Sequence, residues 1–97
     1  MVKIKKIEKE KNVSNDRCLI GVIEKNDLEQ IQISISTFRK KRYLDIRTFY
    51  REDEETEDWK PTKKGISINT EMLEEFKEIV NKGINQLLEE IQKKESI

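Results

Sequence analysis

The sequence contains no histidine, and this absence excludes several kinds of catalytic and metal site. A histidine general base, a histidine metal ligand and a cysteine–histidine pair all require a side chain that this chain does not supply. The three glycines, Gly21, Gly65 and Gly83, stand far apart, so they cannot form a glycine-rich phosphate loop. We therefore expect a protein that is not an enzyme and that uses no metal and no other cofactor.

Cysteine and long apolar runs are also scarce. Cys18 is the only cysteine, which excludes a disulfide within the chain and fits a reducing compartment. The basic segment 1–7 lacks the continuous apolar stretch of a signal peptide. No apolar run approaches the roughly 20 residues that a membrane span needs. These features predict a soluble intracellular protein without a membrane partner, located in the cytoplasm or nucleoid, or in the nucleus of a eukaryote.

The net charge is zero, but the charges are segregated along the chain. The 20 basic residues balance the 20 acidic ones. Residues 39–51 nevertheless hold six basic residues and one acid, Asp45, whereas residues 52–58 hold six acids and no base. Because a phosphate group responds to the local field, the basic segment predicts a surface for a polyanion. The acidic segment is expected to be a loop.

Alternating apolar residues predict a β-hairpin with one apolar face and one polar face that is exposed to water. Ile31, Ile33 and Ile35 point one way, and the polar residues between them point the other way. A tight basic turn at 39–41 leads to a second strand over about 42–50. Cations and aromatic rings interleave around this turn and strand.

Further strands are expected on both sides of the hairpin. Residues 18–24 form a short apolar run, and Asn26-Asp27 supplies a turn signal after it. Another strand begins at 59–61. Lys64-Gly65 is expected to turn the chain into a last short strand over 65–68.

One long amphipathic helix follows, with Asn69 or Thr70 as its N-cap and acidic residues in its first turns. At about 25 residues it would be on the order of 35 Å long. Its apolar surface exceeds what one face of a four-stranded sheet can cover, so we expect a homodimer formed through the helix. Residues 1–28 are interpreted as an N-terminal arm that can supply an extra strand, and residues 29–97 as the functional domain. The expected dimer interface consists of Leu73, Phe76, Val80, Ile84, Leu87 and Ile91.

The residues 33–80 resemble the single-stranded DNA-binding domain of the positive cofactor four (transcriptional coactivator p15) family, which has bacterial and phage relatives. The resemblance rests on three segments: Phe38-Arg39-Lys40-Lys41, Leu44-Asp45-Ile46-Arg47, and Lys60-Pro61-Thr62-Lys63-Lys64-Gly65-Ile66-Ser67-Ile68-Asn69. It implies an α+β fold in which a four-stranded, curved antiparallel sheet precedes one long C-terminal helix. It also implies dimers that present antiparallel channels to two unpaired strands.

The resemblance further implies a nucleic-acid-binding surface. Phe38 would be a stacking platform, and Tyr50 stands where the family commonly has a stacking tryptophan. Trp59 is a candidate to compensate for that difference, or a packing residue. The implied contacts are Phe38, Arg39, Lys41, Arg47, Tyr50, Lys60, Lys63 and Lys64.

These observations predict a non-catalytic, homodimeric single-stranded DNA-binding protein that acts in transcription, replication or recombination. Cations can neutralise phosphates while aromatic rings stack on unpaired bases. No pattern for reading base edges is visible, so little sequence preference is expected. The expected partners are single-stranded or partially melted DNA, together with replication or transcription proteins. The alternative is a dimeric protein-interaction module of the coactivator type, whose basic strip binds an acidic protein. In that case the aromatic residues would be cross-strand packing partners.

Overall fold

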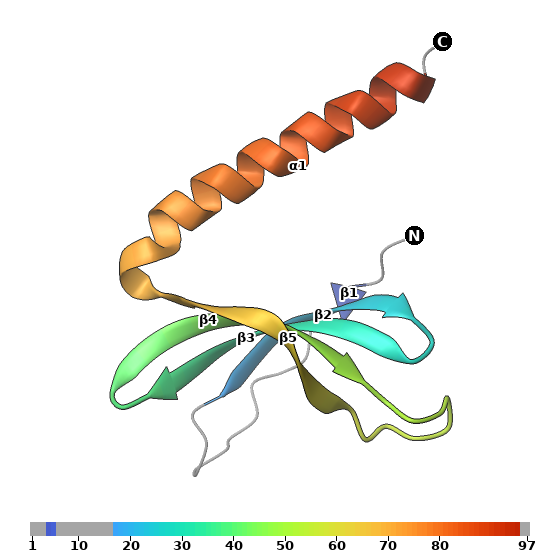
Figure 1. Ribbon diagram of the computed structural model, residues 1–97, viewed down its shortest axis with the longest axis vertical. Coiled ribbons are helices and arrows are strands. Elements are labelled where there is room, and N and C mark those ends of the chain that lie inside the picture. Colours follow the sequence, from blue (N-terminus) through green and yellow to red (C-terminus); the bar gives the residue numbers. More distant parts are fainter. Residues whose placement is uncertain (1–3, 6–16, 96–97) are drawn as a thin grey trace.

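The computed structural model describes residues 4–5 and 17–95, which form one antiparallel sheet followed by one helix (Figure 1). The sheet order is β1-β2-β3-β4-β5, and every neighbouring pair is antiparallel. The predicted fold class, a curved antiparallel sheet before a C-terminal helix, is confirmed. The elements are β1 (Ile4–Lys5), β2 (Cys18–Asn26), β3 (Glu29–Phe38), β4 (Lys41–Tyr50), β5 (Lys60–Asn69), the 3-10 turn η1 (Thr70–Met72) and α1 (Leu73–Glu95).

Four long strands, β2 to β5, make up nearly all of the sheet, and β1 adds two residues that pair with Ile23 and Val22. The strand predicted at 18–24 is therefore part of the same sheet as the hairpin. Most of the predicted N-terminal arm, residues 1–3 and 6–16, lies outside the described residues, and the division at residue 28 stays a prediction.

One predicted boundary is wrong, because the chain does not turn at Lys64-Gly65. β5 runs without interruption and pairs with β4 at both of its ends. A bulge lies between the pairs Arg47–Gly65 and Phe49–Pro61, where the chain advances two residues along β4 and four along β5. Gly65 lies opposite Arg47, and a Cβ on this glycine would come within 2.8 Å of the Ile46 carbonyl oxygen and 2.9 Å of the Arg47 Cβ. The glycine is thus required by the close approach of a neighbouring strand.

The strand register separates two faces of the sheet. Ile31, Ile33 and Ile35 lie opposite Thr48, Ile46 and Leu44, as expected for the apolar face of the hairpin. β5 extends both faces through its own alternation. We call the apolar face the set Ile31, Ile33, Ile35, Leu44, Ile46, Ile66 and Ile68, and the polar face the set Gln30, Gln32, Ser34, Asp45, Arg47, Phe49 and Ser67.

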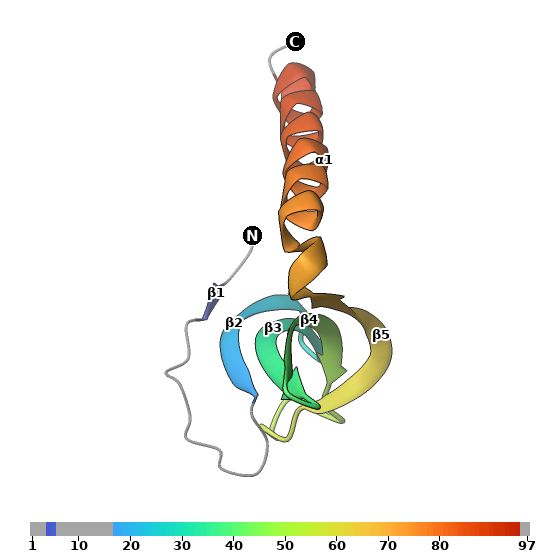
Figure 2. The same cartoon turned by 90° about the vertical axis from the view of Figure 1, so that its left-hand side faces the viewer.

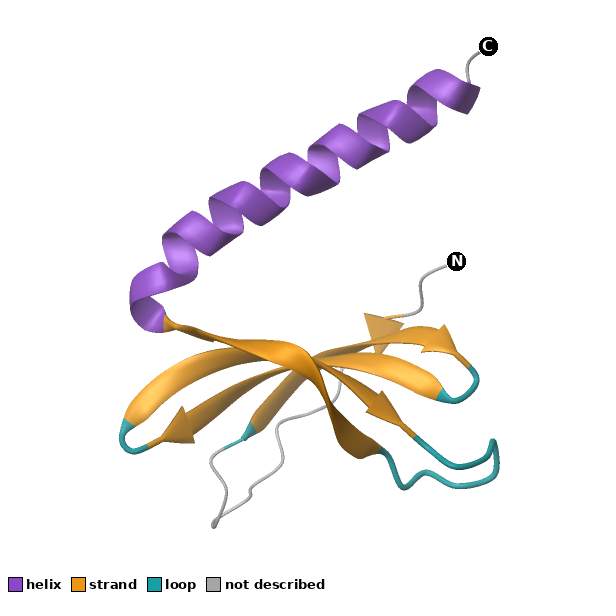
Figure 3. Cartoon of the chain, viewed as in Figure 1, coloured by secondary structure: helices purple, strands orange, loops and turns teal. Residues whose placement is uncertain are grey.

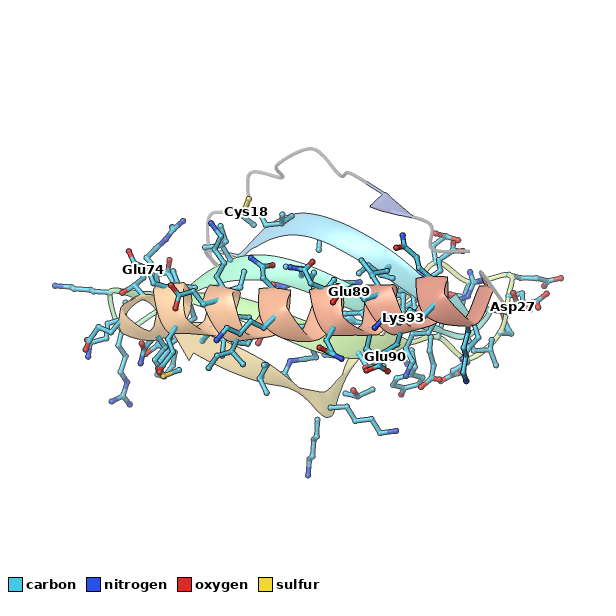
Figure 4. The ribbon with its side chains drawn as sticks, turned by 90° about the horizontal axis from the view of Figure 1, so that it is seen from above. Cys18, Asp27, Glu74, Glu89, Glu90 and Lys93 are labelled. Atoms are coloured by element: carbon cyan, nitrogen blue, oxygen red, sulfur yellow. The ribbon has the colours of Figure 1, made fainter. Side chains whose placement is uncertain are left out.

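The sheet is strongly curved, and α1 stands on its outer side (Figure 2). Ile68, on the apolar face, is only 7% exposed, and the half-buried Leu73 and Phe76 follow it at the start of the helix. The apolar face is therefore the outer, helix-facing side, and the polar face lines the inside of the curve. The prediction that the polar face is exposed to water is wrong, because Gln30, Gln32 and Ser34 are at most 8% exposed inside the curve. Viewed from above, α1 crosses the sheet lengthwise, from Glu74 over one end towards the end where Asp27 lies (Figure 4).

The helix begins as the sequence predicts. The Asn69 side chain caps the first turn, because its Oδ1 accepts a hydrogen bond of 3.1 Å from the Met72 backbone N–H. Acidic residues occupy the first turns and basic residues the last one, which suits the helix dipole. Beyond Phe76, every described side chain of α1 is exposed.

Candidate nucleic-acid interface

The turn between β3 and β4 consists of Arg39 and Lys40, and both have positive φ angles, of 50° and 67°. A two-residue hairpin turn of this geometry normally carries Asn-Gly or Asp-Gly. A side chain with a Cβ costs roughly 1–2 kcal/mol per residue in this region. The chain therefore holds two cations at the tip of the hairpin in a conformation that disfavours them.

This strain leads to a stability prediction. Replacing the turn by Arg39→Asn with Lys40→Gly should raise the free energy of unfolding by about 1 kcal/mol, because both new residues tolerate positive φ. Urea denaturation followed by circular dichroism measures the change. The control, Arg39→Ala with Lys40→Ala, removes the same charges but keeps both Cβ atoms, so it should give no such gain. Equal stabilisation by both variants would show that charge repulsion, rather than backbone strain, destabilises the turn.

An exposed aromatic ring stands beside this turn. Phe38 ends β3 and is 61% exposed, and the Arg39 guanidinium carbon lies 5.2 Å from its ring centroid. Lys41 and Arg42 follow at the exposed start of β4, where Arg42 Nη1 donates to Thr37 Oγ1 at 3.5 Å. An accessible ring beside four consecutive cations is the combination that binds unpaired bases and their phosphates.

Arg47 lies midway along the polar face and is engaged by the protein itself. Its Nη2 and Nε donate to the two carboxylate oxygens of Asp45 at 3.1 and 3.2 Å, and its Nη1 donates to the Thr62 carbonyl at 2.9 Å. Ser67 Oγ also donates to Asp45 at 2.8 Å. The side chain of Arg47 is 25% exposed, so this arginine organises β4 and β5 and leaves only part of its guanidinium to the surface.

Arg17 is a polar-face cation that sequence reasoning missed. Its Nη2 donates to Gln32 Oε1 at 2.7 Å, and its guanidinium carbon lies 5.2 Å from the Phe49 ring centroid. Phe49 is buried, so it serves as a packing residue beneath Arg17. The only signal in the sequence was the position of Arg17 one residue before a predicted strand.

The remaining predicted contacts lie at the other end of β4 and on β5. Tyr50 is partly exposed and lies opposite Lys60, whose Nζ is 3.4 Å from Glu52 Oε1. The hydrogen bond and the charge of Glu52 raise the pKa of Lys60, and Tyr50 and Asp58 add to this effect. Lys60 is thus fully protonated, and the nearby Glu52 carboxylate compensates part of its positive charge.

Lys63 and Lys64 are exposed on the first half of β5. Lys64 lines a shallow depression on the apolar face together with Ile31, Ile46 and Ile66. It also contributes to a lowered pKa of Glu29, after the larger effects of the Asn26 hydrogen bond and the charge of Lys25.

The structure therefore divides the predicted contacts into three places rather than bringing them all together. Phe38, Arg39 and Lys41 form the group at the turn, and Arg47 lies at the centre of the polar face. The third group consists of Tyr50, Lys60, Lys63 and Lys64.

The acidic loop lies at the end of β4 opposite to the basic turn (Figure 3). Asp53 Oδ1 accepts hydrogen bonds from the backbone N–H groups of Glu55 and Thr56 at 2.9 and 3.1 Å, which fixes the loop. Arg51 packs over the Trp59 ring, with its guanidinium carbon 4.7 Å from the centroid. The sheet is thus basic at one end and acidic at the other.

Within residues 17–95, no group of three or more histidine, cysteine or acidic side chains is placed to hold a metal ion. The one long helix in that part of the chain is too polar to cross a membrane.

Residues 25–79 match the sequence model of the family described as Transcriptional Coactivator p15 (PC4), and this match spans more than half of the chain. The chain belongs to this family. The resemblance predicted from the segments around Phe38, Arg47 and Lys60 is thereby confirmed. The p15 (PC4) match includes the basic turn and all of β5, but it leaves out Arg17 and most of α1. Comparisons with curated proteins and with solved structures found no match.

Proposed function

We propose that this p15 (PC4) family member is a non-catalytic, homodimeric protein that binds single-stranded DNA with little sequence preference along the strand. The basic turn carries the proposal. Two cations occupy a conformation that favours Asn-Gly. They directly follow Phe38, whose aromatic side chain is exposed to solvent in the single chain. Strain of this kind persists where a functional requirement maintains it. Family membership supports DNA as the ligand.

The binding free energy would come from stacking and from phosphate neutralisation. Base–aromatic stacking is worth about 1–3 kcal/mol per base and does not depend on sequence. Phe38 supplies an accessible ring for it. Exposed lysines and arginines at the turn and on β5 supply phosphate contacts, and their contribution decreases as salt increases.

The apolar stripe of α1 supports a dimer. Val80, Ile84, Leu87 and Ile91 are between 39% and 60% exposed in the single chain. The radius of gyration is 15.9 Å, compared with about 13 Å for a compact domain of ~100 residues, because the helix stands away from the sheet. A second copy packed against α1 would cover this stripe.

A twofold axis would make the two binding surfaces run in opposite directions. Such a dimer can hold both strands of a melted segment at once, so it should prefer bubble-like or partially melted DNA. Transcription, replication and recombination all produce such DNA.

A mobility-shift comparison of one sequence as single strand, duplex and bubble tests this function. We expect the protein to bind bubble and single-stranded DNA with much higher affinity than duplex DNA. Its affinity for oligo-dT should fall steeply as the salt concentration rises. A duplex preference would contradict the proposal. Complete absence of DNA binding would favour the alternative, in which the basic turn binds an acidic protein.

A further inference from the structure

A pocket of about 140 Å³ opens at the acidic end of the polar face. It lies between the β2–β3 turn and the loop after β4, which are joined by a backbone hydrogen bond of 3.0 Å from Arg51 N–H to the Leu28 carbonyl. The volume is close to that of an engineered cavity of ~150 Å³ that admits a benzene ring. The pocket is thus large enough for one planar ring.

The Gln30 side chain lines this pocket and has no partner there. Gln30 is only 5% exposed, yet its amide makes no hydrogen bond to any other residue in the described part of the chain. Gln32, two residues along the same face, is paired, because its Oε1 accepts from Arg17 at 2.7 Å. Among the described residues, only Ser34 Oγ is a fully buried side-chain atom without a hydrogen-bond partner, so the Gln30 amide reaches the solvent of the pocket. Its donor and acceptor are therefore available to a ligand.

Another part of the pocket lining consists of planar groups that hydrogen bonds hold in place. Arg51 lies against the Trp59 ring, and both residues line the pocket. Two backbone carbonyls fix the guanidinium, since Arg51 Nε donates to Asp27 O at 2.8 Å and Nη1 donates to Thr56 O at 3.1 Å. A guanidinium and an indole offer flat surfaces of the kind on which nucleobases stack.

The charge of the lining selects against a phosphate. The carboxylates of Glu24, Asp27 and Glu57 outnumber the single cation, Arg51. A carboxylate accepts hydrogen bonds from an amino group, and a glutamine amide pairs with the N6 and N7 atoms of adenine. Thymine presents carbonyl oxygens where adenine and cytosine carry amino groups, so it would face these carboxylates unfavourably.

We infer that this pocket receives one base of the bound strand and prefers adenine or cytosine, which carry an amino group (N6 or N4) where thymine has its O4 carbonyl, over thymine. Gln30 reads the base edge, and the carboxylates of Glu24 and Glu57 accept from the amino group. This inference rests on the proposed single-strand binding and adds selectivity at one nucleotide to it. Glu24 lies outside the p15 (PC4) match, so this selectivity depends partly on residues particular to this chain.

Fluorescence-anisotropy titrations with three strands test the inference: oligo-dT, and the same strand with one central adenine or one central cytosine. The wild-type protein should bind the two substituted strands at least about fivefold more tightly. Gln30→Leu should lose this preference while its affinity for oligo-dT stays within about twofold, because stacking and phosphate contacts remain. The matched control is Gln92→Leu, on the exposed helix, which should keep the preference.

Trp59 gives a second measurement that needs no variant, because it is the only tryptophan. At saturation, the adenine-containing strand should quench its fluorescence more than oligo-dT does. Equal affinity and equal quenching for all three strands would overturn the inference and leave the proposed function intact. Failure of the wild-type protein to bind any of the strands would overturn the proposed function itself.

Discussion

Two carboxylates placed in the apolar stripe of α1 should convert the protein from a dimer into a monomer. Ile84→Glu with Leu87→Glu puts both charges on the side of the helix that we propose meets the second copy. The measurement is light scattering coupled to gel filtration, in which the wild-type protein should have twice the chain mass of 11.6 kDa and the variant the chain mass itself.

The expected effect is large because each carboxylate would lose its hydration without gaining a partner. Ile84 and Leu87 are 49% and 60% exposed in the single chain, so the contact with a second copy would account for most of their burial. A buried, uncompensated charge costs several kcal/mol. The dimer dissociation constant should therefore rise by at least about a hundredfold.

The control places the same two charges on another side of the helix. Asn85→Glu with Gln92→Glu changes exposed polar residues away from the apolar stripe, and this variant should stay dimeric. The sheet should keep its circular dichroism signal in both variants, since α1 makes few contacts with it and the main ones are to β5. A wild-type protein with the mass of one chain would contradict the dimer and the paired surfaces that depend on it.

Local pattern predicted much of this fold. The alternation of Ile31, Ile33 and Ile35 identified the apolar face, and the register with β4 confirms it. The Asn69 cap and the helix followed from residues close together in the sequence. The turn predicted at Lys64-Gly65 was wrong because the role of this glycine depends on a residue far away in the sequence. A glycine within a strand can mark a turn or a close approach, and here only the position of Arg47 on the neighbouring strand decides between them.

The residue types of the candidate site could be predicted from the sequence, but the contacts that these residues make with one another could not. The exposed Phe38 and the cations around it could be named from their spacing. The hydrogen bond from Arg47 to the Thr62 carbonyl depends on how β4 and β5 align. Gln30 attracts no notice in the sequence, because an alternating glutamine is an ordinary surface residue of a strand. Its burial follows from the curvature of the sheet, which turns the polar face inward.

Removing the ring of Phe38 and the charge of Lys64 together should weaken binding to unpaired DNA by at least about tenfold. Phe38→Ala deletes a stacking surface, and Lys64→Ala deletes one phosphate contact. Both side chains are exposed, and the Lys64 side chain makes no hydrogen bond to another described residue, so the double variant should fold normally. Titration of oligo-dT by fluorescence anisotropy measures the loss, with Lys82→Ala on the helix as the control for a lost surface charge.

The two single variants should differ in their response to salt, which separates the two contributions. Phe38→Ala should weaken binding by a similar factor at every salt concentration, because stacking releases no counterions. Lys64→Ala should reduce the slope of log affinity against log salt by about 0.7, the value for one phosphate contact on a single strand. A folded double variant with unchanged affinity would show that DNA binds elsewhere on the protein. A Phe38→Ala variant that altered only the salt slope would show that the ring positions the cations of the turn and does not stack on a base.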